Sequence, residues 1–157
     1  MEYSTEFQEL TSQEFTSIDM PSRNHAGILS NINGLFYPYR EKYRLYSQLS
    51  VHLNGWDSIP DFCLYPHTEI QWDEDELVVT TAPIMVIEIL SPKQAVKDLT
   101  DKFKQYFKAG VQSCWLVNPT LEEVVVFGSS GTKSFYHDGT ITDPATAISI
   151  AFSDIFE

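Results

Sequence analysis

A single glutamate interrupts one of the most apolar stretches of the sequence. Glu88 lies in the segment IMVIEILSP at 84–92, among Ile, Met, Val and Leu. Side chains alternate along a strand, so Glu88 shares one face with Val86 and Leu90, and two isoleucines take the other face. Both faces are apolar, which predicts a strand that is covered on both sides. A buried carboxylate without a partner is costly, so Glu88 should be paired, bound to a metal or neutralised.

A second acid, Asp61, opens the strand-like segment DFCLYP at 61–66. If this strand lies beside the strand of Glu88, the two carboxylates converge at one edge of a sheet. Converging carboxylates repel each other unless a cation lies between them. Two acid ligands with retained waters suit Mg²⁺ or Mn²⁺, which can polarise a phosphodiester and lower the pKa of an attacking water. The two acids therefore suit a divalent-metal site, and the alternatives are that Glu88 pairs with a structural Lys or Arg and that Asp61 only caps the turn after SIP.

A lysine on the helix that follows Glu88 completes this set. Lys102 is the one of four lysines in that helix that lies nearest the apolar stripe, which includes Leu99 and Tyr106. Its stem can run along apolar surface toward Glu88. Asp98 lies one turn earlier and could orient it. We predict catalytic roles for Asp61, Glu88 and Lys102 with support from Asp98, and we interpret Tyr106 as a core aromatic.

The elements that must position these groups follow from periodicity and from breakers. Helices are expected at 24–36, capped by Ser22 or Asn24, and from about 98 to the cap at Gly110. Strands are expected at 43–53, 61–66, 84–90, 113–118 and 122–128, with short pieces in TKSFYHDG and at the C-terminus. NGWDSIP is expected as a loop and HTEIQWDEDE as an exposed acidic loop. The order predicts an α/β fold with a mixed β-sheet flanked by helices, in one domain over 1–157 with an N-terminal arm or short helix at 1–22.

Composition excludes several classes of protein. The chain has 157 residues, 43% of them hydrophobic, and a net charge of −12, which argues against a generally basic nucleic-acid surface. No apolar run approaches the roughly 18 residues that span a bilayer, and the N-terminus lacks the pattern of a signal peptide. We therefore expect no membrane association and a cytoplasmic location. Cys63 and Cys114 are expected as reduced core residues.

The combined run of IPD, VIEILSP and DLTDKFKQYFKAGVQSCWLVNP resembles the Uma-two family of endonucleases, within the PD-(D/E)XK restriction-endonuclease-like superfamily. The similarity covers roughly His25 to Phe127. It implies a restriction-endonuclease-like core and a Mg (or Mn) site at Asp61 and Glu88. His25 matches a family histidine near the site and is expected in a supporting role.

This chain departs from the family pattern at three places. Leu90 stands where the motif lysine should fall, two residues after Glu88, and Lys102 matches the helix position to which that lysine can move. The family's WLVDP is WLVNP here, with Asn118, and SIDMPSRNH replaces the usual hairpin before the first helix. The first departure makes Lys102 the expected basic group of the site.

The sequence is compatible with three functional hypotheses. The first is a Mg-dependent endonuclease acting on nucleic acid, with DNA favoured over RNA as substrate. The alternative is a catalytically inactive nuclease fold that serves as a binding or regulatory module, which the net charge of −12 favours. A homodimer is the third, with Trp56, Trp72 and Tyr37 as candidate interface aromatics. Clustering of Lys and Arg around Asp61 and Glu88 would favour the enzyme over the module.

Overall fold

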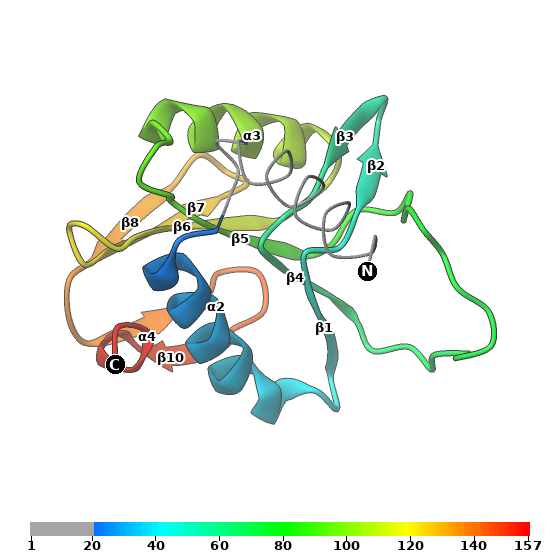
Figure 1. Ribbon diagram of the computed structural model, residues 1–157, viewed down its shortest axis with the longest axis horizontal. Coiled ribbons are helices and arrows are strands. Elements are labelled where there is room, and N and C mark those ends of the chain that lie inside the picture. The colour runs from blue at the N-terminus through cyan, green and yellow to red at the C-terminus, as the bar shows by residue number, and fades with distance from the viewer. Residues whose placement is uncertain (1–20) are drawn as a thin grey trace, which may run out of the picture.

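The computed structural model of the chain describes residues 21–157, so nearly all of the expected N-terminal arm lies outside the described part. A six-stranded mixed sheet in the order β1-β4-β5-β6-β7-β8 forms its centre (Figure 1). Its strands are β1 (Tyr43–Ser47), β4 (Phe62–Pro66), β5 (Met85–Ile89), β6 (Ser113–Asn118), β7 (Glu123–Gly128) and β8 (Lys133–Tyr136). The predicted mixed α/β architecture is confirmed.

The only parallel pair of this sheet joins β5 to β6, and every other pairing in it is antiparallel. A parallel connection needs a crossover, and helix α3 (Val96–Lys108) provides it. All residues of β5 and β6 are buried. The uninterrupted apolar run around Glu88 therefore reflects a central strand that is covered on both faces.

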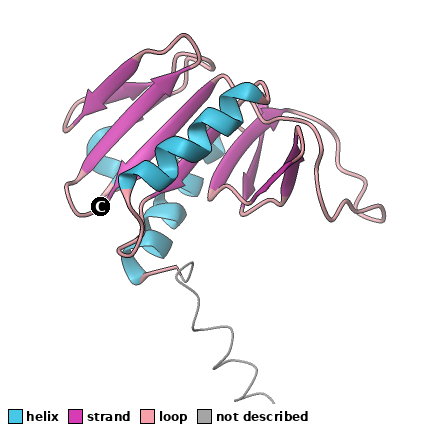
Figure 2. Ribbon diagram, turned by 90° about the horizontal axis from the view of Figure 1, so that it is seen from above, coloured by secondary structure: helices cyan, strands magenta, loops and turns pink. Residues whose placement is uncertain are grey.

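Two layers cover the sheet (Figures 1 and 2). Helix α2 (Arg23–Phe36), the hairpin of β9 (Thr140–Thr142) and β10 (Ser149–Ala151), and α4 (Phe152–Ile155) pack with Ile87 and Ile89 of β5 on one face. Helix α3 and the hairpin of β2 (Val51–Leu53) and β3 (Trp56–Ser58) pack with Val86 on the other face. Strand alternation thus directs Glu88 toward α3.

Local signals set the ends of both long helices. The Ser22 hydroxyl accepts the His25 N–H at the start of α2, which confirms Ser22 as the cap. Helix α2 ends at Phe36, and Pro38 lies in the short 3₁₀ helix η1 (Tyr37–Tyr39) that follows. Gly110 follows α3 with a φ of +104°, a left-handed conformation that glycine adopts without strain.

The hairpin beside α3 differs from the predicted strand at 43–53 and the predicted loop at 54–60. Gln48 has a φ of 53°, and it separates β1 from β2. Asn54 and Gly55 also have positive φ and form the tight turn from which β3 returns along β2. The Asn-Gly pair indicated the turn in the sequence. The strands on either side of it have only three residues each, which is too short to show an alternation with a period of two. Strand β9 was not predicted for the same reason.

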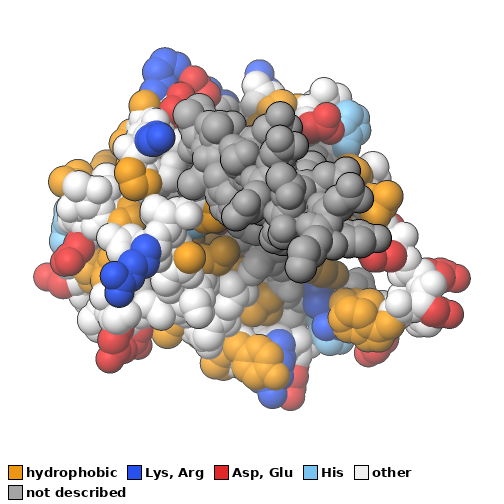
Figure 3. Space-filling model, in the orientation of Figure 1, with side chains coloured by type: hydrophobic (Ala, Val, Ile, Leu, Met, Phe, Trp, Pro, Cys, Tyr) orange, Lys and Arg blue, Asp and Glu red, His pale blue; other side chains and the backbone are white. Residues whose placement is uncertain are grey.

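The connection from β4 to β5 projects from the body of the molecule as the expected acidic loop (Figure 1). Acidic side chains gather on it, at the right of Figure 3. Trp72 within it is 85% exposed. Trp56, another of the candidate interface aromatics, is half-buried against the α3 face and is less available for an interface. Cys63 and Cys114 are free and buried, as predicted. Within 21–157, no helix is long and apolar enough to cross a membrane.

Candidate active site

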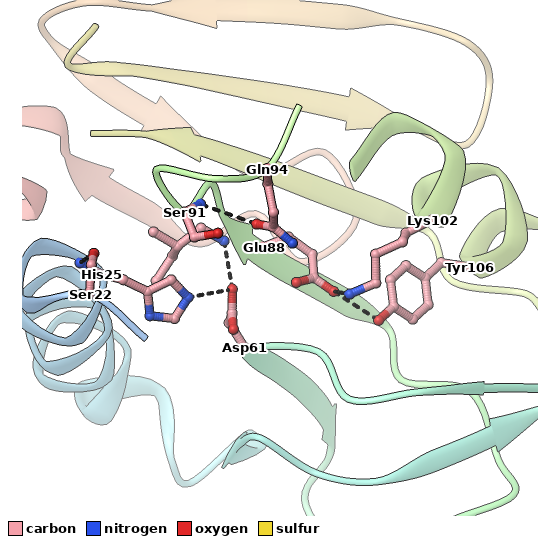
Figure 4. A network of polar contacts seen from close by, with 9 residues as sticks. Ser22, His25, Asp61, Glu88, Ser91, Gln94, Lys102 and Tyr106 are labelled. Atoms are coloured by element: carbon pink, nitrogen blue, oxygen red, sulfur yellow. Dashed lines mark hydrogen bonds and ion pairs between the residues drawn. The ribbon is translucent and has the colours of Figure 1, made fainter. Parts of the chain in front are cut away.

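The register of β4 and β5 brings the two predicted acids together. Phe62 pairs with Ile87 and Cys63 pairs with Val86. Continued by one residue, this antiparallel register sets Asp61, just before β4, opposite Glu88 near the end of β5. The charge of Asp61 raises the pKa of Glu88, so the two carboxylates lie within electrostatic range of each other, although Asp61 is held from the α2 side and Glu88 from the α3 side. The close-up in Figure 4 shows both carboxylates at this edge of the sheet.

Asp61 is held by a backbone group of β5 and by a histidine of α2. Its Oδ2 accepts the Ile89 N–H at 2.8 Å and lies 3.1 Å from His25 Nε2 (Figure 4). His25 is buried in the first turn of α2, which the Ser22 cap fixes. The hydrogen bond to Asp61 raises the pKa of His25, and burial opposes this rise. The first helix therefore fixes the position of the Asp61 carboxylate.

Glu88 is only 3% exposed, and α3 provides its partners. Lys102 Nζ lies 3.0 Å from Glu88 Oε1, and the Tyr106 hydroxyl donates to the same oxygen at 3.0 Å. Burial raises the pKa of Glu88 to about 7, an effect that Lys102 opposes and the charge of Asp61 reinforces. Glu88 is thus an acid whose charge depends on the cations near it.

The contacts leave one oxygen of each acid available. Within 21–157, Asp61 Oδ1 and Glu88 Oε2 have no hydrogen-bond or ion-pair partner, while Oδ2 and Oε1 carry all the contacts. No group of three or more His, Cys, Asp or Glu side chains in this range could hold a metal ion. Carboxylate oxygens are the donors that Mg²⁺ and Mn²⁺ prefer, so the donor type of these two free atoms is compatible with a divalent cation.

Two comparisons with known proteins found a match. The family model described as "Uma2: Putative restriction endonuclease" matches residues 3–153. The chain belongs to the Uma2 family. It is also similar to the crystal structure of "a putative nuclease belonging to DUF820" from Anabaena variabilis ATCC 29413, with 25% sequence identity, a TM-score of 0.73, and coverage of 87% of this chain and 82% of that one. No curated protein matches the chain.

This membership confirms the resemblance that the Asp61, Glu88 and Lys102 segments indicated, and the structural match confirms the nuclease-type fold. Lys102 reaches Glu88 as its position on the helix predicted. Asp98 does not contact Lys102 within residues 21–157; its carboxylate accepts the Ala95 N–H and caps the start of α3. Asp98 therefore supports the helix in this Uma2 protein rather than the lysine.

Two residues at the candidate site were missed in the sequence. Tyr106 was interpreted as a core aromatic; its ring is in the core, but its hydroxyl bonds Glu88. Ser58, in the segment expected as a loop, lies 2.7 Å from the same hydroxyl. The signal for Tyr106 was its spacing, because residue i+4 from Lys102 lies on the same helix face. Nothing in the local pattern indicated Ser58.

Proposed function

We propose that this chain is a divalent-metal-dependent endonuclease that hydrolyses phosphodiester bonds of nucleic acid, with DNA favoured over RNA. One observation carries the proposal: Asp61, just before β4, and Glu88, on the neighbouring β5, lie at one edge of the sheet, and each keeps one carboxylate oxygen without a partner in the described chain. Lys102 lies at the same carboxylate. Membership of a family described as restriction endonucleases supports the reaction class.

Each residue has a distinct role in this proposal. Asp61 Oδ1 and Glu88 Oε2 would hold Mg²⁺ or Mn²⁺, which when bound polarises the phosphoryl oxygens and lowers the pKa of a water nucleophile. The Lys102 side chain is 29% exposed. Its Nζ would supply a fixed positive charge where negative charge develops on the phosphate. His25 holds Asp61 in place from α2.

The distribution of basic residues favours approach of nucleic acid at this edge of the sheet. Arg23 begins α2, and Lys93 lies between β5 and α3. Lys97 lies in the first turn of α3, where it pairs with Asp101 at 2.7 Å. All three segments adjoin the site. The other group of basic residues belongs to the opposite end of α2 and to β1: Arg40, Lys42 and Arg44. Phosphate contacts near the site would thus come from a small local patch on an acidic molecule.

The direct test is titration of Mn²⁺ by calorimetry, followed by cleavage of plasmid and single-stranded DNA. The wild type should bind Mn²⁺, and Asp61→Asn and Glu88→Gln should each lose this binding and the nicking activity. Lys102→Ala should retain binding and lose activity. Lys104→Ala is the matched control, since Lys104 is exposed on the same helix and pairs with Asp101. Equal Mn²⁺ binding by wild type, Asp61→Asn and Glu88→Gln would refute the assignment.

A binding or regulatory module without catalysis is the second candidate, favoured by the net charge of −12 and by the basic residues at the far end of the molecule. It predicts Mn²⁺-independent DNA binding, or none, and no cleavage at any salt concentration. Cleavage that needs both acids excludes it.

We further propose that the active form is a homodimer. Tyr37 is 58% exposed and Trp72 is 85% exposed, which makes both available for an interface. Light scattering coupled to size exclusion gives the mass directly, and Trp72→Ser should return a dimer to a monomer. A wild type that elutes with a monomer mass at high protein concentration would contradict this proposal.

A further inference from the structure

Both donors to Glu88 bind the same carboxylate oxygen. Lys102 Nζ and the Tyr106 hydroxyl each lie 3.0 Å from Oε1, and they come from positions one helical turn apart on α3. A carboxylate oxygen has two lone pairs, so these contacts fill Oε1. The oxygen left to accept anything further is Oε2.

The Tyr106 hydroxyl bonds a second side chain. Ser58 Oγ lies 2.7 Å from it in a buried contact. Tyrosine has one hydroxyl proton, which it donates to Glu88, so Ser58 must donate to the tyrosine oxygen. The chain of donors runs from Ser58 to Tyr106 to Glu88 (Figure 4 shows its second step). Every link is directed toward the carboxylate.

The hairpin of β2 and β3 also holds the tyrosine ring. Trp56 packs edge to face on Tyr106, with ring centroids 4.9 Å apart and an interplanar angle of 74°. Trp56 and Ser58 occupy one strand and share one side of it, so the hairpin contacts both the ring and the hydroxyl. A buried tyrosine has two side-chain torsions, whereas Lys102 has a flexible four-carbon stem that is partly exposed.

We propose that Ser58 and Tyr106 form a positioning relay that fixes the Glu88 carboxylate with Oε1 occupied and Oε2 free for the divalent cation. The proposal rests on the metal site described above and goes beyond it: it assigns a functional role to the hairpin and to a tyrosine of the core. Lys102 provides a positive charge at Oε1, and the relay fixes the orientation of the Glu88 carboxylate.

The test is Mn²⁺ affinity by calorimetry in variants that remove one hydroxyl each. Tyr106→Phe should weaken binding about tenfold, as is usual when the partner of a metal ligand is lost, and Ser58→Ala should weaken it by a smaller factor because Ser58 acts through the tyrosine. Ser58→Thr keeps the hydroxyl and should restore wild-type affinity. Adding Ser58→Ala to Tyr106→Phe should have no further effect, because the relay is already broken.

Two matched controls separate the relay from general loss of buried hydroxyls. Tyr65→Phe removes a hydroxyl that donates to the Thr81 carbonyl, and Ser113→Ala removes a buried hydroxyl that has no partner in the described chain. Both should leave Mn²⁺ affinity unchanged. Thermal unfolding of each variant shows whether it is folded at the titration temperature.

The outcomes distinguish the relay from the proposed function. If the wild type binds no Mn²⁺, or if Glu88→Gln binds Mn²⁺ as well as the wild type does, both the proposed metal site and the relay are refuted. If binding depends on Glu88 but Tyr106→Phe and Ser58→Ala bind like the wild type, the relay alone is overturned. The relay is also overturned if Ser58→Thr does not restore Mn²⁺ affinity. It is overturned as well if Ser58→Ala lowers the affinity further when added to Tyr106→Phe.

Discussion

At the scale of single residues, Glu88 is the group in which stability conflicts with the proposed function. The protein buries a carboxylate in a central strand, and burial raises its pKa from 4.5 to about 7. The folded state then binds a proton more tightly than the unfolded state between these values. The contribution of protonated Glu88 to the free energy of unfolding is fully present below pH 4.5 and is lost as the pH rises through 7. A side chain that stays neutral at this position should not show this loss of stability at high pH.

We therefore expect Glu88→Gln to be more stable than the wild type at pH 8, by up to about 3 kcal/mol, and to be similar to it near pH 4. Urea unfolding at several pH values measures both curves. Glu76→Gln, on the exposed acidic loop, is the control and should leave the profile unchanged. A Glu88→Gln variant that is less stable than wild type at pH 8 would show that the ion pair with Lys102 outweighs the cost of burial.

Lys102 should matter for stability only when Glu88 is charged. Removing the amine leaves a buried carboxylate with the Tyr106 hydroxyl as its remaining donor in the described chain. We expect Lys102→Ala to cost about 2–3 kcal/mol at pH 8 and less at pH 5, because Glu88 is then protonated. Lys104→Ala loses a surface pair and should cost less than about 0.5 kcal/mol at both pH values. Equal losses for the two lysines in urea unfolding would contradict the assignment.

The position of Lys102 could be predicted from the sequence and the contact of the Tyr106 hydroxyl could not, for one reason. Helical phase fixes the side of a helix on which a residue lies, and it placed Lys102 toward Glu88. It cannot tell whether the end of a buried aromatic meets carbon or a carboxylate. Tyr106 and Ser58 meet only because the β2–β3 hairpin folds over α3, a tertiary contact with no periodic signature.

At the scale of elements, the start of α2 connects helix stability to the site. Ser22 caps the helix, and the capped N–H is that of His25, whose ring holds Asp61. Ser22→Ala should cost about 1 kcal/mol of stability, measured by thermal or urea unfolding. Ser30→Ala is the matched change in the exposed middle of the same helix and should be neutral or slightly stabilising. If both variants behave alike, the cap does not stabilise the helix.

The elements around Glu88 were predicted well because their patterns are long or strongly biased. Strand β6 has the predicted bounds of Ser113–Asn118, and α3 carries an apolar stripe over three turns. The 43–53 segment was predicted as one strand because its alternation continues across Gln48, where the backbone turns. A turn at a residue other than glycine leaves no mark in hydropathy, so the hairpin that completes the site could not be placed.

At the scale of the whole molecule, charge is separated along the sheet. The site lies where β4 begins and β5 ends, whereas the acidic loop joins the opposite ends of the same strands. The length of β5, five residues, sets the two regions about 17 Å apart. This exceeds the screening length of about 10 Å in 0.1 M salt, but not the longer one at low ionic strength. The loop should therefore repel nucleic acid only in dilute salt.

This separation gives a prediction that depends on ionic strength. Neutralising the four consecutive acids of the loop, Asp73→Asn, Glu74→Gln, Asp75→Asn and Glu76→Gln, removes four of the 22 acidic side chains without a change near the site. We expect kcat/KM for plasmid cleavage to rise about threefold in ~20 mM salt and to match the wild type in ~200 mM salt. Gln71→Ala alters the same loop without changing its charge and should have no effect at either salt concentration. A gain that persists at high salt would mean that the loop contacts the substrate directly, because repulsion across the length of β5 is screened there.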